Sequence, residues 1–189
     1  MHKLIGVIVY ALNEEDAIDN ASAILGKIVR RGDYDYYILL GDEYTTRRWG
    51  DLKPVYRADS EDGKKLINDL MDKTFNEFKE KLNIVRKILK TFSDEEIFEQ
   101  QTNIIKCIAL NKAQIKEWKT LLHHLSLIKH YFYCLCDYSC LNTYLIDNDG
   151  EPIHNFNHLK KVLEKWRRSN GYTPYEDMNV YIVPADVHY

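Results

Sequence analysis

The stretch KLIGVIVYAL, residues 3–12, is a continuous run of mostly apolar and β-branched residues with the length of a strand. A strand that is apolar on both of its alternating faces is buried on both sides, so this stretch predicts a strand at the centre of a sheet. The next stretch, NEEDAIDNASAILGKIVRRG (13–32), places apolar residues at helical spacing and three acids in the first turn. We expect a helix capped by Asn13 and ended by Gly32.

The remaining strand and helix patterns repeat this order at the other end of the chain. DYDYYILL (33–40) predicts a second strand, rich in aromatic and apolar residues. After residue 140 the chain again offers a strand, an amphipathic helix and a strand, in LNTYLIDNDGEPI (141–153), FNHLKKVLEKWRRSNG (156–171) and MNVYIVPADVHY (178–189). Two β-α-β units therefore flank the middle of the sequence.

The middle of the sequence has a helical pattern. Apolar residues recur in steps of three and four from Ile67 to Phe92, which predicts one long helix of roughly 50 Å. SDEE (93–96) resembles a capping box, so a new helix is expected there, and residues 97–133 continue mostly helical. Residues 41–59, with Gly41, Gly50 and Pro54, are expected to form a loop.

This order of elements predicts an α+β protein. It is compatible with a ferredoxin-like βαβ…βαβ sandwich, a four-stranded, mainly antiparallel sheet with two helices on one face. We expect a single domain over residues 1–189, with residues 60–133 as a helical insertion or arm between the two halves.

Composition limits the classes of partner and compartment. With 26 basic and 29 acidic residues the net charge is −3, which disfavours nucleic acid as a partner. The apolar run near Met1 is followed at once by acids and is too short for a signal peptide or a membrane span. Cys134, Cys136 and Cys140 are crowded together, unlike the cysteines of a secreted disulfide framework. We therefore expect a cytoplasmic protein with reduced thiols and no membrane partner.

The stretch YTTRRWGD, residues 44–51, allows two interpretations. Arg47 and Arg48 could bind a phosphate or carboxylate while Trp49 offers a ring for stacking. Alternatively, Trp49 anchors the segment to the core and the arginines pair with neighbouring acids. The position before the long helix favours the anchor, and Trp49→Ala is then expected to cost on the order of 3 kcal/mol or more.

Two further groups of residues suggest chemistry. Asp186 and His188 are two residues apart and share a face if the segment is extended, which is the minimal arrangement for orienting an imidazole as a general base. His130 and the three nearby cysteines supply soft ligands on one local segment, without the separated pairs of a structural zinc site. We therefore expect no metal and no cofactor.

The long apolar stripe carries the functional hypothesis. It needs a partner along its length, and a second copy of the chain is the commonest one. Fourteen tyrosines, among them Tyr34, Tyr36 and Tyr37 around the second strand, suggest a partly polar sheet face suited to a partner. The leading interpretation is a non-catalytic binding or assembly module that forms a homodimer through its arm. The alternative is a hydrolase-type enzyme acting on an anionic substrate.

Overall fold

The computed structural model describes residues 1–91, 93–95, 140–168 and 178–189 of the chain. The chain divides into two compact units, Met1–Phe75 with Tyr138–Tyr189, and Asn76–Asp137. All the strands among the described residues belong to the first unit. No helix in the described ranges is both long enough and apolar enough to cross a lipid bilayer.

The sheet of the first unit is mixed and has five strands in the order β2-β5-β1-β4, with β3 paired to β5 beside β2. Its strands are β1 (His2–Ala11), β2 (Tyr36–Leu39), β3 (Tyr56–Arg57), β4 (Leu145–Ile146) and β5 (Asn179–His188). β5 runs antiparallel to β1, β2 and β3, whereas β4 runs parallel to β1. The first and last strands of the chain are thus neighbours along their whole length, and β1 is an interior strand, as its apolar sequence predicts.

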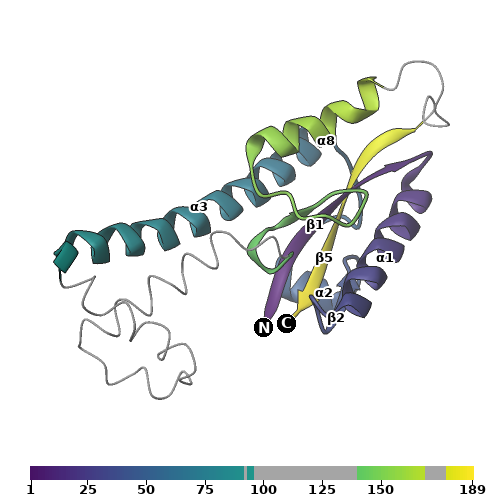
Figure 1. Ribbon diagram of the computed structural model, residues 1–189. Helices are drawn as coiled ribbons and strands as arrows, with labels where there is room; N and C mark the ends of the chain where they lie inside the picture. The colour runs from purple at the N-terminus through teal and green to yellow at the C-terminus, as the bar shows by residue number, and fades with distance from the viewer. Residues whose placement is uncertain (92, 96–139, 169–177) are drawn as a thin grey trace. The chain divides into compact units, whose positions relative to one another are not determined.

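Alternating residues of β1 and β5 build two cores, one on each face of the sheet. One core joins residues such as Val7 and Val183 to the buried face of α1 (Glu14–Arg31). The other joins Ile8 and Ile182 to the start of α3 (Glu61–Thr91) and to α8 (Phe156–Arg168). Figure 1 shows α1 on one side of β1 and β5, and α8 on the other. Helices therefore cover both faces of the sheet.

The α+β class is confirmed, but the predicted four-stranded sheet is not what the structure shows. The sheet has a fifth strand, it is mixed, and the ferredoxin-like layout is not confirmed. One reason is that Leu145 and Ile146 pair with β1 in parallel, and the chain turns directly afterwards, where Asp147 accepts hydrogen bonds from the backbone of Asp149 and Glu151 at 2.9 Å. The strand expected over 141–153 is therefore only two residues long, and its direction depends on a partner distant in sequence.

The expected helix after β1 is confirmed with its caps. The side chain of Asn13 accepts a hydrogen bond from the Asp16 backbone nitrogen at 2.9 Å. Gly32 ends the helix at φ 88°, and its N–H reaches the carbonyl groups of Ile28 and Val29. A left-handed residue at this position favours glycine, which explains why the helix ends there.

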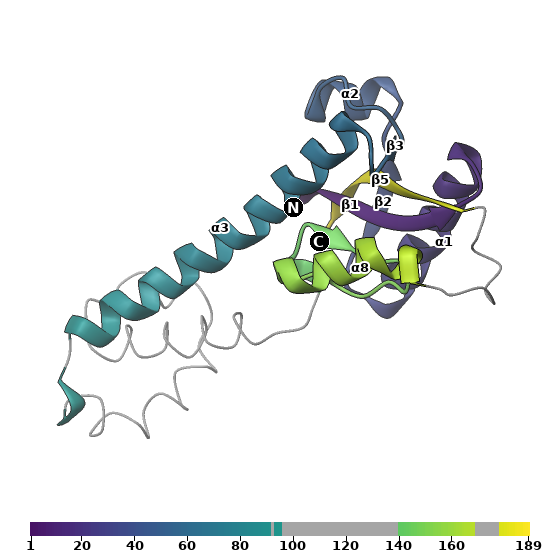
Figure 2. The same cartoon turned by 90° about the horizontal axis from the view of Figure 1, so that it is seen from above.

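The predicted loop over residues 41–59 is wrong in part, because it contains the helix α2 (Glu43–Trp49) and the short strand β3. The Asp42 side chain accepts from the Thr45 backbone nitrogen at 2.8 Å, and the Thr45 side chain closes a capping box with the Asp42 backbone. Gly50 follows at φ 80° and ends the helix. These caps stabilise a seven-residue helix that lacks a long apolar stripe, which is why the pattern of apolar residues did not reveal it. Figure 2 shows α2 beside the start of α3 within the first unit.

The long helix is confirmed as α3, which spans Glu61–Thr91 and runs from the first unit into the second. Its first half packs on the sheet through Leu66, Ile67, Leu70 and Met71. Glu96 of the expected capping box and the helices expected over 97–133 lie outside the described residues. The division into one domain with an insertion at 60–133 stays a prediction.

Candidate functional site

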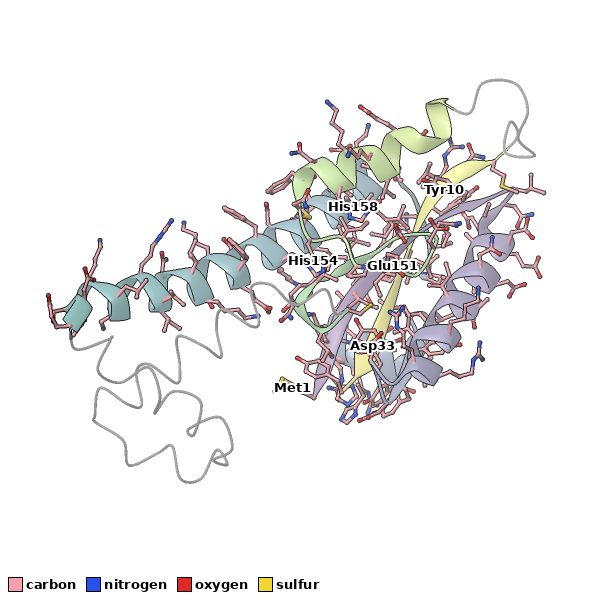
Figure 3. The ribbon with its side chains drawn as sticks, in the orientation of Figure 1. Met1, Tyr10, Asp33, Glu151, His154 and His158 are labelled. Carbon is pink, nitrogen blue, oxygen red and sulfur yellow. The ribbon has the colours of Figure 1, made fainter. Side chains whose placement is uncertain are left out.

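Polar and aromatic side chains gather at the end of the sheet where β1 begins and β5 ends. His188 pairs in register with His2 on one side and with Tyr36 of β2 on the other. Asp186 lies two residues earlier on β5 and therefore on the same face. In Figures 1 and 3 this end of the first unit carries both termini, and Figure 3 labels Met1 there. With the neighbouring side chains, we call this group the terminal histidine cluster: His2, Asp35, Tyr36, Tyr44, Arg48, Asp186 and His188.

Asp186 holds His2 in a defined orientation. The carboxylate is fully buried, and both of its oxygens lie 3.1 Å from His2 Nδ1. A carboxylate at Nδ1 selects the tautomer in which Nδ1 carries the proton, so Nε2 of a neutral imidazole is the hydrogen-bond acceptor. His2 Nε2 lies 3.5 Å from the Tyr36 hydroxyl. The pair therefore presents Nε2 as the proton-accepting atom.

Helix α2 brings Arg48 to the same carboxylate. Arg48 Nε lies 3.7 Å from Asp186 Oδ2, and Arg48 Nη2 donates to the Tyr44 hydroxyl at 2.9 Å. The side chain of Arg48 is 37% exposed, so the guanidinium is accessible to solvent beside a buried anion. A buried carboxylate without partners is strongly destabilising. Asp186 avoids this cost because His2 from β1 and Arg48 from α2 both lie next to it.

His188 has an equivalent arrangement at the edge of the cluster. Its Nδ1 lies 2.8 Å from Asp35 Oδ2, and its Nε2 lies 3.1 Å from the Met1 nitrogen. The ring stacks on Tyr36 with centroids 5.0 Å apart and planes at 5°. The His2 and His188 rings are edge to face, also at 5.0 Å. The cluster thus holds two imidazoles side by side, each with a carboxylate at Nδ1.

The structure brings together some of the predicted site residues and separates others. Arg48, Asp186 and His188 meet in the cluster. Arg47 does not, because it forms an ion pair with Glu43 one turn earlier on α2 and its side chain is 79% exposed. Trp49 is half-buried and packs against the core cluster that contains residues of the sheet and of α3, and its role as an anchor stays a prediction. Its Nε1 is buried without a hydrogen-bond partner among the described residues.

Sequence reasoning missed four members of the site, namely His2, Asp35, Tyr36 and Tyr44. His2 stands at the start of a strand, and no residue near it in sequence suggests chemistry. The signal that would have found it is the antiparallel pairing of β1 with β5, which sets His2 opposite His188. This pairing joins residues from the two ends of the chain, and period-two alternation alone does not predict it.

No group of three or more His, Cys, Asp or Glu side chains within the described ranges is arranged to hold a metal ion. His130, Cys134 and Cys136 lie outside those ranges, so the prediction that they hold no metal stays a prediction. Cys140 is buried, and burial raises the pKa of its thiol to about 11. At neutral pH this thiol is protonated and is neither a nucleophile nor a ligand.

A separate hollow of about 250 Å³ lies in the first unit near the other end of β5. Its lining combines the aliphatic side chains of Ala58, Leu163 and Val180 with the polar side chains of Asp59, Lys64, Glu164 and Asn179. None of the residues predicted from the sequence as site residues lines it. The predicted site residues that the structure brings together are in the terminal histidine cluster instead.

Fold and cluster define an α+β protein with a mixed sheet and a polar site where its first and last strands meet. Residues 1–112 match the family described as a domain of unknown function (DUF7995), more than half of the chain, and the chain belongs to this family. The matched residues include His2, Tyr36, Tyr44 and Arg48 but neither Asp186 nor His188. No curated protein and no solved structure matches the chain.

Proposed function

We propose that the protein is a binding module whose terminal histidine cluster holds an anionic group, a phosphate or a carboxylate. The observation that carries this proposal is the placement of Arg48, accessible to solvent and oriented by Asp186 and Tyr44. A guanidinium held in this way offers fixed donors to a phosphate or carboxylate oxygen. The imidazoles of His2 and His188 add two donors when they are protonated.

The balance of charge makes this binding depend on pH. With both imidazoles neutral, the carboxylates of Asp35 and Asp186 face the guanidinium of Arg48 and the Met1 amine. Protonation of both imidazoles adds two positive charges to the cluster and favours an anion. Affinity for an anion should therefore be higher at a pH where the imidazoles carry protons.

The experiment is titration calorimetry of the full chain with inorganic phosphate at pH 6 and pH 8. We expect Arg48→Ala to weaken binding by about tenfold or more, since a charge-assisted hydrogen bond is lost. Arg48→Lys keeps a positive charge beside Asp186 but loses the planar fork, so it should bind with intermediate affinity.

Arg47→Ala is the matched control, because Arg47 is the neighbouring residue on α2 and pairs only with Glu43 among the described contacts. We expect it to bind phosphate as the parent does. Equal affinity of the Arg48 and Arg47 variants, with both folded, would show that Arg48 does not hold the anion and would contradict the proposal.

We also propose that the protein associates with a second copy of itself through the arm at residues 60–133, most simply as a homodimer. The support is on α3, where the apolar side chains of Phe75, Phe78 and Leu89 are exposed and share one face of the helix. Exposed apolar side chains along one helix are typical of a surface that another chain covers, and a two-fold pair is the commonest closed arrangement. The test is the mass of the protein in sedimentation velocity.

A further inference from the structure

The two histidines of the cluster have the arrangement of an acid and base pair. Each Nδ1 faces a carboxylate, Asp186 for His2 at 3.1 Å and Asp35 for His188 at 2.8 Å. This leaves Nε2 of each ring as the atom that exchanges protons. The ring centroids are 5.0 Å apart. The two imidazoles are therefore adjacent, as a pair that acts on one bound group has to be.

Anion binding alone does not need this arrangement. An arginine with surrounding donors is sufficient to hold a phosphate, whereas a carboxylate at Nδ1 fixes the tautomer and the direction of an imidazole. An imidazole oriented by a buried carboxylate is the arrangement that general-base catalysis requires. A second oriented imidazole next to the first supplies the general acid.

We infer that the cluster cleaves a ribonucleotide phosphodiester, with His2 as general base and His188 as general acid around a phosphate held by Arg48. This inference rests on the proposed anion binding. The substrate class follows from what the residues can supply. A histidine pair moves protons but brings no nucleophile, and the 2′-hydroxyl of a ribonucleotide is an internal nucleophile with high effective molarity next to its own phosphate.

The reaction balances within the substrate and the two imidazoles. His2 Nε2 takes the proton from the 2′-hydroxyl while the 2′-oxygen forms a bond to phosphorus. The bond between phosphorus and the 5′-oxygen breaks, and protonated His188 gives its Nε2 proton to that oxygen. The products are a 2′,3′-cyclic phosphate and a free 5′-hydroxyl. The protons then return through solvent, from His2 and to His188.

The atoms that now contact the two Nε2 nitrogens are positions for the substrate oxygens. The Tyr36 hydroxyl lies 3.5 Å from His2 Nε2, and the Met1 nitrogen lies 3.1 Å from His188 Nε2. The 2′-hydroxyl and the 5′-oxygen replace these partners when the substrate binds. The titratable and charged groups that surround the imidazoles are Asp35, Tyr36, Tyr44, Arg48 and Asp186, together with the Met1 amine.

The net charge of the protein limits the length of the substrate. A net charge of −3 gives the protein no broad attraction for a long polyanion, so recognition concerns one phosphate and its adjoining nucleotides. The exposed ring of Tyr44, which lies beside Arg48 with the guanidinium carbon 5.3 Å from the ring centroid, offers a surface on which a base can stack. A dinucleotide is therefore the appropriate probe.

The experiment uses the full chain and the dinucleotide uridylyl-3′,5′-adenosine in the presence of EDTA, with the 2′,3′-cyclic phosphate measured by chromatography. We expect His2→Gln and His188→Gln each to lower the rate by about 100-fold or more. The deoxy analogue, which lacks the 2′-hydroxyl, should not be cleaved. His158→Gln is the control, because His158 lies on α8, away from the Met1 end in Figure 3, and it should cleave at the parent rate.

The pH profile separates the two roles. The parent should show a bell-shaped profile, because the base must be neutral and the acid protonated. His2→Gln should lose the limb on the acidic side, and His188→Gln the limb on the alkaline side. A merely structural role for either histidine would lower the rate at every pH without removing a limb.

Two outcomes would overturn the inference. The first is a parent protein that binds phosphate through Arg48 but forms no cyclic phosphate from the dinucleotide, which leaves the binding proposal intact. The second is cleavage at the parent rate by His2→Gln, which would assign the activity to other residues or to a contaminant. Because the profile is measured on the parent as well, the test stands even if one variant fails to fold.

Discussion

Asp186 is the residue on which the geometry of the cluster depends. Its carboxylate is fully buried, and it lies within reach of His2 from β1 and of Arg48 from α2. Burying a charged carboxylate is costly unless partners satisfy it, so the pairing constrains all three side chains together. Asp186 therefore links the start of the chain, the short helix and the last strand in one site.

The stability of Trp49 variants tests the anchor interpretation of residues 44–51. Its ring packs against the core between the sheet and α3, so Trp49→Ala should lower the free energy of unfolding by about 3 kcal/mol. Trp49→Phe keeps an aromatic ring and removes an Nε1 donor that has no partner among the described residues, so it should cost clearly less.

Urea unfolding of the two Trp49 variants beside the parent measures this difference. Arg47→Ala serves as a surface control, for which we expect a change within about 0.5 kcal/mol. An unchanged stability for Trp49→Ala would overturn the anchor interpretation and favour a role for this ring in ligand binding.

Helix α2 is a short helix that is stabilised by the capping residues at its ends. It has seven residues, too few to be stable alone, and the capping box of Asp42 and Thr45 satisfies its first backbone donors. The Thr45 side chain is buried and the exposed face carries the pair of Glu43 with Arg47. The neighbouring arginine, Arg48, points about 100° away from Arg47 and lies in the cluster.

Removal of the cap should weaken both the helix and the site that it carries. We expect Asp42→Ala to lower the melting temperature by about 3 °C at pH 7, and to weaken phosphate binding because Arg48 is less well held. Asp42→Asn retains a side-chain acceptor and should lose less. Melting curves and the phosphate titration measure the two effects.

The effect of Asp42→Ala should also depend on pH. Hydrogen bonds from the side chain and backbone of Thr45 lower the pKa of Asp42 below its ordinary value. A carboxyl whose pKa is lowered by folding stabilises the protein above its unfolded pKa, and this contribution is lost as the pH falls through the folded pKa. The difference between parent and Asp42→Ala should therefore narrow on acidification. A difference that stays constant down to pH 3 would show that the charge of Asp42 has no part in the cap.

At the scale of the whole molecule, α3 connects the unit that contains the sheet to the second unit. Its first half is buried by the sheet through Leu70 and Met71, whereas Phe78, Ile84 and Leu89 further along are exposed. The two halves of α3 therefore differ in how far their apolar side chains are buried. The first half is stabilised within the chain, and the second half leaves apolar side chains exposed.

The proposed self-association through α3 can be tested in solution. We expect sedimentation velocity at micromolar concentration to show a dimer, and Phe78→Glu to raise the dissociation constant by about tenfold or more, because a charge is then buried in the contact. Lys79→Glu places a glutamate at the adjacent position of the helix, about 100° around its axis, and should leave the dimer unchanged. A parent protein that sediments as a monomer would contradict the proposed assembly.

Local patterns in the sequence were sufficient to predict the elements whose ends are capped by neighbouring residues or whose faces are uniformly apolar. The run over residues 3–12 predicted β1 and its interior position, the residues around Asn13 and Gly32 predicted the ends of α1, and the stripe from Ile67 predicted α3. Each of these signals lies within a few residues of the structure that it predicts, since capping and helical periodicity are short-range effects.

The site was decided by tertiary structure. Alternation along β5 placed Asp186 and His188 on one face, but only the pairing of the first strand with the last set His2 beside them. Likewise, adjacent arginines on a helix point about 100° apart, so Arg48 rather than Arg47 meets Asp186 only once α2 is packed on the sheet. Strand pairing and helix packing join residues that are distant in sequence, and their free energy comes from burial that no local pattern records.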